Sequence, residues 1–279
     1  MSPLANHPPG QADIAALKAR ARRLRRHMLI MARGPGQGYV GQGLGIADLM
    51  AALYFHEMRW DPSNLADPDR DRFLLSTGHY SIALWAVLAE AGVFPLDELG
   101  TYGADDSRLQ MSTLDTTPGV EIIGGSLGQG LGQAVGMALG LRLQGSPARV
   151  FCELSDGELQ EGSTWEAAMS APGFGLANIV ALIDCNGIQA DGAIVLDIEP
   201  VAAKWRAFGW QTTEIDGNDL SAITQTLTEA RQAEKPVAIV LRTRPGKGVP
   251  TLENREKSHF LRVEPDEWDD LIAELEARP

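Results

Sequence analysis

Cysteine is scarce in this sequence: its 279 residues include only Cys152 and Cys185. Both lie in apolar runs, so we expect buried free thiols, no disulfide framework and a cytoplasmic location. No apolar run reaches the roughly 18 residues that a membrane span needs. The N-terminus lacks a charged start followed by an apolar stretch, so it does not look like a secretory signal. These absences argue against disulfide-rich secreted proteins and membrane proteins.

Positive charge is also limited. Lys and Arg number 24 against 37 Asp and Glu, which gives a net charge of −13. Such a chain repels phosphate backbones, so we expect no nucleic-acid partner. The basic run at 20–27 fits the solvated face of a first helix, with Leu17, Leu24 and Met28 on its inner side. An anionic cofactor would need a local site, built from a metal ion and backbone N–H groups.

Apolar runs alternate with helical stretches along the chain, and neither a repeat nor a linker interrupts them. We therefore predict one domain over 1–279, with a flexible tail at about 1–12. The runs expected to be strands are 72–76, 149–155, 178–184, 210–216 and 236–242. Near-continuous apolar strands separated by helices indicate an α/β fold with a doubly wound parallel sheet.

Helices are expected between and around these strands. Their predicted ranges are 13–32, 46–56, 158–171, 199–208, 219–234 and 265–278, the last an acidic amphipathic helix. Pro172 and Gly173 are expected to end the third of these helices. We expect a Gly-rich loop at 34–45 and a change from loop to helix near Ser126.

Two polar segments follow neighbouring predicted strands. Asp156 and Gly157 come directly after one buried run, and Asn186 follows the next. The carboxyl ends of neighbouring parallel strands face one crevice, where ligands bind. Carboxylate and amide oxygens suit Mg²⁺ or Ca²⁺, and a helix beginning near Glu158 would point its N–H groups at a phosphate. The pattern predicts a metal-bound diphosphate site, although Asp-Gly at one strand end alone is more often a turn.

Three ordered motifs resemble one known family. SDGELQEGSTWEAAM (155–169) and LIDCNGIQADG (182–192) are similar to the N-terminal subunits of split transketolases, the halves that bind thiamine diphosphate. GVEIIGGSLGQGLGQAVGMALG (119–140) looks like the family's third diagnostic segment. The resemblance covers about residues 15–262. It implies the diphosphate-domain fold of thiamine-diphosphate enzymes, with thiamine diphosphate and Mg²⁺ or Ca²⁺ as cofactors.

The resemblance also implies roles for single residues. The metal ligands would be the side chains of Asp156 and Asn186 and the backbone oxygen of Ile188. The cofactor contacts would come from Gly125 and Leu127 at the aminopyrimidine, Gly157 at the diphosphate, and His79 and His259 near the diphosphate and the reacting carbon. Glu161 would couple the two active sites of the assembly. Plain alternatives are that His79 is a capping residue, His259 an exposed side chain and Glu161 an acid of a first helical turn.

One essential group has no counterpart in the chain. Thiamine-diphosphate enzymes need a glutamate that protonates the pyrimidine ring, and the family places it in a second, pyrimidine-binding domain. The chain ends about where that domain would begin. We therefore expect a C-terminal transketolase-like partner chain to supply the glutamate. The two chains would form a heterotetramer that acts on a small-molecule substrate only when assembled.

The sequence departs from the family at three positions, of which one, Ser155 in place of a glycine, is a small change that should not prevent diphosphate binding. Tyr39 stands where the family has a histidine in its first Gly-rich loop, and Met111 stands in place of another. Both family histidines bind donor hydroxyls. We therefore expect altered sugar recognition and a less hydroxylated donor.

Four functions stay open. The first is transketolase-like transfer of a two-carbon ketol or acyl unit to an aldehyde or related acceptor. The second is transfer from a 2-oxo acid in specialised metabolism, and the third is a 2-oxo-acid dehydrogenase component with a lipoyl partner. The fourth, a non-catalytic binding subunit, is disfavoured because Asp156 and Asn186 are both present.

Overall fold

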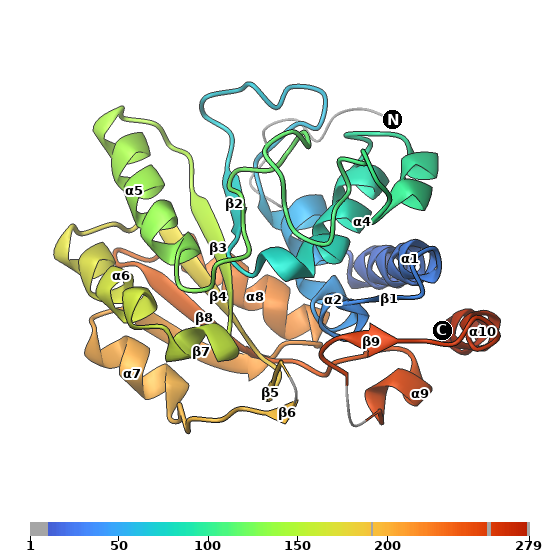
Figure 1. The fold of residues 1–279 in the computed structure, drawn as a ribbon. Helices are drawn as coiled ribbons and strands as arrows, with labels where there is room; N and C mark the ends of the chain where they lie inside the picture. The colour runs from blue at the N-terminus through green and yellow to red at the C-terminus, as the bar shows by residue number, and fades with distance from the viewer. Residues whose placement is uncertain (1–10, 191, 256–257, 278–279) are drawn as a thin grey trace.

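A five-stranded parallel sheet forms the centre of the computed structural model, which describes residues 11–190, 192–255 and 258–277 (Figure 1). The strands lie in the order β2 (Arg72–Leu75), β3 (Val150–Ser155), β4 (Ile179–Cys185), β8 (Val237–Arg242) and β7 (Gln211–Asp216). All neighbouring pairs are parallel. The predicted parallel sheet is confirmed, and all five predicted strands belong to it. Most of the predicted N-terminal tail, residues 1–10, lies outside the described residues.

Helices cover both faces of the sheet (Figure 1). On one face are α5 (Gly130–Leu143), α6 (Gly162–Gly173) and α7 (Val201–Ala207); on the other are α1 (Ile14–Arg33), α3 (Ala47–Ala52), α4 (Ser81–Ala91) and α8 (Leu220–Ala230). Successive strand residues alternate between the two cores: Phe151 packs with the second group of helices, whereas Cys152 packs with the first. This alternation explains why the central strands read as continuous apolar runs.

The path of the chain agrees with right-handed crossovers. It moves from β4 past β8 to the edge strand β7 with α7 on one face. It then turns back to β8 through α8, which lies on the opposite face because the direction of travel is reversed. Helices on both faces make the sheet doubly wound, as predicted.

Smaller elements complete the structure. They are α2 (Val40–Gly45), α9 (Pro250–Glu253), α10 (Trp268–Glu276), the hairpin of β5 (Ile188–Gln189) and β6 (Gly192–Ala193), and the antiparallel pair of β1 (Gln37–Gly38) and β9 (Leu261–Arg262). Shorter helical turns cover Leu53–Glu57, Gly78–Tyr80, Leu96–Thr101 and Gly157–Gln160. The β1–β9 pair matters most for the site, because it joins two segments far apart in sequence. No helix among the described ranges is both long and apolar enough to span a membrane.

The segment at 34–45 was predicted as a loop, but its second half is the helix α2. Its glycines allow close packing rather than loop flexibility. A Cβ on Gly41 would lie 2.6 Å from the Ser258 carbonyl oxygen, and one on Gly43 would lie 2.8 Å from the Ile82 side chain. Tertiary packing therefore overrides the low helix propensity of glycine here.

Pro172 and Gly173 were predicted to end a helix, and α6 does end at Gly173, so that both residues form its last turn. Pro172 lacks the N–H that would bond the carbonyl of Ala168, four residues earlier. That carbonyl instead accepts a hydrogen bond from Trp210 Nε1 at 2.7 Å. The same helix was expected to begin near Glu158; a short 3₁₀ turn occupies Gly157–Gln160, and α6 begins at Gly162.

Two other boundaries differ from the predictions. The helix expected near Ser126 begins at Gly130, and α4 was not predicted because it is apolar on nearly every side. The C-terminal helix is present as α10, whose inner side carries Trp268, Leu271 and Leu275.

Candidate functional site

Asp156 and Asn186 follow adjacent parallel strands, β3 and β4, and their loops meet at the carboxyl edge of the sheet. Ser155 pairs with Asp184 in register, and the Asp156 backbone N–H donates to the Asp184 carbonyl at 2.9 Å. The Asp156 carboxylate accepts hydrogen bonds from Gly157 N at 2.8 Å and from Gly187 N at 2.6 Å. The carboxylate thus fixes the loop that carries Asn186.

A buried network fixes the orientation of the Asn186 amide. Its Nδ2 donates to Asp184 Oδ2 at 2.7 Å and to the Tyr80 hydroxyl oxygen at 2.9 Å. Thr243 Oγ1 donates to the other Asp184 oxygen. Because the amide nitrogen is held on this side, the Asn186 Oδ1 faces the opposite way, where it accepts from Ile188 N at 3.0 Å. Asp184, Tyr80 and Thr243 were not singled out from the sequence.

The carboxylates of Asp156 and Asp184, at these strand ends, are buried and pair with no basic side chain of the described residues. Asp156 is 3% exposed and Asp184 is fully buried. Burial, and secondarily the charge of Asp184, raises the pKa of Asp156 to about 7; burial raises the pKa of Asp184 to about 6. Within the described residues, no Lys or Arg forms an ion pair with either group. A buried charge of this kind is stabilised by a bound cation, so the donor set fits a divalent metal.

The described residues contain no cluster of three or more His, Cys, Asp and Glu side chains suited to a metal. The predicted ligand set includes only one such side chain, Asp156, together with an amide and a backbone carbonyl. Oxygen donors of these kinds are those that Mg²⁺ and Ca²⁺ take, with water or phosphate oxygens completing the shell. The predicted set is therefore not a cluster of that kind.

The expectation that a helix N-terminus faces this crevice is wrong. A 3₁₀ turn of four residues follows Asp156, and its first donors have internal partners. Gly157 N bonds to Asp156 Oδ1, and Glu158 N bonds to Ser155 Oγ at 3.2 Å. Gly157 nevertheless leaves room above the turn, because a Cβ there would meet only Gln189 Cβ at 3.6 Å and Ser155 Oγ at 3.9 Å.

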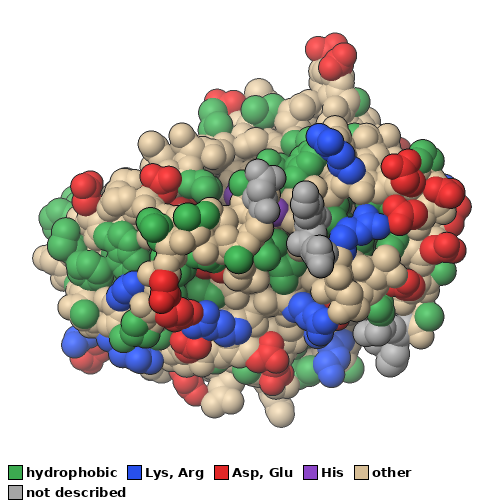
Figure 2. Space-filling model, turned by 60° about the horizontal axis from the view of Figure 1, so that its bottom comes forward, with side chains coloured by type: hydrophobic (Ala, Val, Ile, Leu, Met, Phe, Trp, Pro, Cys, Tyr) green, Lys and Arg blue, Asp and Glu red, His purple; other side chains and the backbone are tan. Residues whose placement is uncertain are grey.

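Aromatic and imidazole rings gather beside the strand-end site. Tyr39 packs edge-on against His79 with ring centroids 4.7 Å apart, against His259 at 5.4 Å and against Phe260 at 5.0 Å. The centroids of the two histidine rings are 5.5 Å apart. The β1–β9 pair creates this cluster, since it sets the segment of Tyr39 against that of His259 and Phe260. In the space-filling view, small areas of histidine side chain are visible between the surrounding side chains (Figure 2).

His79 sits in the turn after β2 and is largely buried. Burial, with a smaller contribution from His259, lowers its pKa to about 3. The imidazole is therefore neutral at physiological pH, with one nitrogen that donates and one that accepts. Such a ring can position a ligand by hydrogen bonds, or pass a proton, without presenting a fixed charge.

The loop that carries Gly125 and Leu127 is tied to the same strand ends. The Glu158 carboxylate, fully buried, accepts from Gly128 N at 2.7 Å and from Ser76 Oγ. Gly125 has a φ of +133°, which favours glycine. Glycine is also required in the neighbouring turn, since a Cβ on Gly78 would lie 2.3 Å from the backbone of Gly124. These contacts hold the loop close to the turn of His79.

Two other predicted residues have no described contact with the rings of Tyr39, His79 and His259. Glu161 is exposed at the start of α6, beside Gly128. Met111 is half-buried against the core, and its Cε lies 3.3 Å from the Cβ position of Gly103. The structure thus shows Tyr39 in contact with both histidines, whereas the contacts described for Met111 are with the core.

Comparison with known proteins identifies the family of this chain. The family model described as "Transketolase, thiamine diphosphate binding domain" matches residues 20–275. The chain belongs to the transketolase family. Its central sheet and helices correspondingly form the diphosphate-binding α/β fold of thiamine-diphosphate enzymes.

Relatives of similar length lie within the transketolase family. A putative uncharacterized transketolase family protein of Sinorhizobium fredii is 54% identical over 267 residues, covering 94% of this chain and 96% of the relative. A protein of Clostridium sp. named as a 6-deoxy-6-sulfo-D-fructose transketolase subunit is 39% identical, with 86% and 89% covered. A protein of Actinobacillus succinogenes, named as one of the subunits of an apulose-4-phosphate transketolase, is 35% identical, with 93% and 95% covered.

Solved transketolases have the same fold over part of their length. The transketolase of Campylobacter jejuni superposes with a TM-score of 0.88 at 29% identity. The match covers 95% of this chain but only 43% of that transketolase. The chain therefore spans less than half the length of this solved relative.

Proposed function

We propose that this chain is the cofactor-binding half of a two-subunit, thiamine-diphosphate-dependent transketolase-type enzyme. The observation that carries the proposal is the buried Asp156 carboxylate, which is held against the Asn186 loop and pairs with no Lys or Arg of the described residues. The family match supports the proposal, because it is to the thiamine-diphosphate-binding domain. The enzyme would transfer a two-carbon ketol or acyl unit from a donor to an aldehyde or related acceptor.

The strand-end residues would hold the cofactor. Asp156, the Asn186 side chain and the Ile188 backbone oxygen would bind Mg²⁺ or Ca²⁺, and Gly157 would lie against the diphosphate. Gly125 and Leu127 would contact the aminopyrimidine through their backbone. Bound thiamine diphosphate supplies a carbon nucleophile and an electron sink. His79 and His259, whose rings face Tyr39, would orient the reacting groups and carry protons at their ring nitrogens.

A partner chain would complete the site. The two relatives named as transketolase subunits are covered over 89% and 95% of their length by this chain, whereas it covers 43% of a solved transketolase. This supports a separate C-terminal chain that carries the pyrimidine-binding domain and its glutamate. We propose a heterotetramer with two active sites, in which the exposed Glu161 at the start of α6 links the sites.

The donor would be less hydroxylated near its reacting carbon than an ordinary ketose phosphate. Tyr39 packs against His79, His259 and Phe260, at the position where the family has a hydroxyl-binding histidine. The relatives named for a sulfonated fructose and for apulose 4-phosphate support an unusual sugar with an acidic group. A 2-oxo acid is the second candidate donor, favoured by the ring-filled space around Tyr39.

The direct test measures turnover with and without the second chain. The purified chain alone, given thiamine diphosphate and Mg²⁺, should show no ketol transfer, and a cognate C-terminal chain should restore it. The mass of the active complex should correspond to two copies of each chain. Robust turnover by the single chain would contradict the two-subunit proposal, and no turnover by any assembled complex would contradict the enzymatic one.

A further inference from the structure

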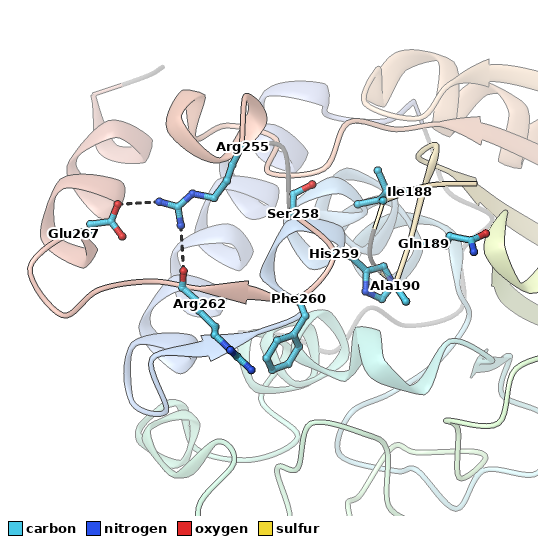
Figure 3. Close-up of a pocket in the computed structure, with 10 residues that line it drawn as sticks. Ile188, Gln189, Ala190, Arg255, Ser258, His259, Phe260, Arg262 and Glu267 are labelled. Carbon is cyan, nitrogen blue, oxygen red and sulfur yellow. Dashed lines mark hydrogen bonds and ion pairs between the residues drawn. The ribbon is translucent and has the colours of Figure 1, made fainter. Parts of the chain in front are cut away.

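A pocket of about 510 Å³ adjoins the ring cluster on its open side. The hairpin residues Ile188, Gln189 and Ala190 line one wall, and the segment around β9 lines the other (Figure 3). His259 and Phe260 belong both to this pocket and to the ring cluster around Tyr39. The pocket is thus continuous with the candidate active site and borders the strand-end site at Ile188.

Two arginines and one glutamate line the pocket, and two of the three charges are engaged with each other. Arg255 Nη2 lies 2.8 Å from Glu267 Oε1, and Arg255 Nη1 donates to the Arg262 carbonyl at 3.3 Å (Figure 3). The second Glu267 oxygen accepts from Glu264 N at 3.0 Å. Arg262 forms no ion pair with any residue that the structure describes. Among the described charged residues that line the pocket, Arg262 is therefore the one whose charge is not paired with another side chain.

The backbone directs Arg262 toward the site. Leu261 is buried, whereas Phe260 and Arg262 on either side of it line the pocket. Alternate residues of an extended segment point to the same side, about 7 Å apart. Figure 3 shows the Arg262 side chain reaching the same side as the Phe260 ring. Phe260 packs against Tyr39, and Arg262, two residues further along the chain, lies next to Phe260 on the same side of the segment.

We propose that Arg262 binds the acidic group at the end of the donor far from its reacting carbon. The group would be a phosphate or a sulfonate, either of which accepts hydrogen bonds from a guanidinium. The reacting end of the donor would lie at the rings of His79 and His259, and its acidic end in the pocket. This inference rests on the proposed function and adds to it the residue that selects an acid-ended substrate.

Kinetics of the assembled complex test the inference. The variants are Arg262→Ala, Arg262→Lys and Arg262→Glu, with Arg206→Ala on the distant helix α7 as a matched control. The donors are xylulose 5-phosphate, 6-deoxy-6-sulfofructose and the uncharged ketose erythrulose. Arg262→Ala should raise KM for the two charged donors at least tenfold and leave kcat and the use of erythrulose nearly unchanged. Arg262→Glu should raise KM for the charged donors more than Arg262→Ala does, and Arg262→Lys should raise it less. The Kd of thiamine diphosphate should not change in any of the three variants.

Direct binding separates this inference from the function on which it rests. Inorganic phosphate and methanesulfonate are titrated calorimetrically into the wild-type complex and into Arg262→Ala. Binding that depends on Arg262 would support the anion site even if no donor is turned over, in which case only the proposed function fails. Three results would overturn the inference that Arg262 binds the acidic group. They are equal effects on charged and uncharged donors, a change in the thiamine-diphosphate Kd alone, and anion binding that is independent of Arg262.

Discussion

The Asn186 amide nitrogen donates to the fully buried Asp184 carboxylate at 2.7 Å, two residues earlier on the same strand end. Because Tyr80 and Thr243 also donate to Asp184, that carboxylate has defined partners at both oxygens. The consequence is a fixed amide plane, with Asn186 Oδ1 directed away from Asp184. Groups that orient metal ligands in this way affect metal affinity although they do not touch the metal.

The first prediction concerns this orientation. Asp184→Asn should weaken binding of Mg²⁺ with thiamine diphosphate by about 10- to 100-fold, because the Asn186 amide loses its anionic partner. Calorimetric titration of the cofactor, run separately with Mg²⁺ and Ca²⁺, measures the effect. The exposed Asp105→Asn is the control. An unchanged cofactor Kd in a folded Asp184→Asn protein would show that the network is structural only.

The second prediction concerns Asp156. Asp156→Asn should weaken cofactor and metal binding by several kcal/mol, because a charged ligand is removed from a buried site. The metal-free protein should lose little stability, because burial already disfavours the ionised carboxylate in the absence of a cation. Calorimetry and urea unfolding measure the two quantities. If Asp156→Asn lowers the free energy of unfolding but leaves cofactor affinity unchanged, Asp156 is not a metal ligand.

The third prediction concerns pH. The pKa of His79 is lowered to about 3 in the folded protein, against about 6.5 when unfolded. As the pH falls below 6.5, His79 becomes protonated in the unfolded chain but stays neutral in the folded protein. The free energy of unfolding that is present above pH 6.5 is therefore progressively lost. His79→Gln should remove this contribution, worth about 2 kcal/mol between pH 7.5 and pH 5.

Urea unfolding of wild type and His79→Gln at both pH values measures the difference. His259, whose ring lies 5.5 Å from that of His79, is the neighbouring titratable group, so His259→Gln is the comparison variant. Equal pH dependence in wild type and His79→Gln would mean that His79 is not buried in its neutral form.

Sequence patterns predicted the sheet because strands buried on both faces are continuously apolar, and they predicted the meeting of Asp156 and Asn186 because parallel strand ends share one edge. They did not predict α4, which is buried on nearly all sides and has no helical periodicity. Nor did they predict that the buried carboxylates of Glu158 and Asp184 hold the neighbouring loops by hydrogen bonds. These roles depend on partners such as Ser76 and Tyr80, which are far away in sequence.

The last prediction concerns donor choice. Tyr39 lies among His79, His259 and Phe260, and its phenol occupies space that a sugar hydroxyl would need. Tyr39→His should therefore raise kcat/KM for xylulose 5-phosphate relative to hydroxypyruvate and pyruvate in the assembled complex, since a smaller ring leaves room and an imidazole can bond the hydroxyl. Met111→His alone should change this ratio less, because the Met111 side chain packs against Gly103 and the core. The double variant measures whether the two positions act together. If the wild-type complex already uses xylulose 5-phosphate fastest, Tyr39 does not exclude hydroxylated donors, and the partner chain sets donor choice.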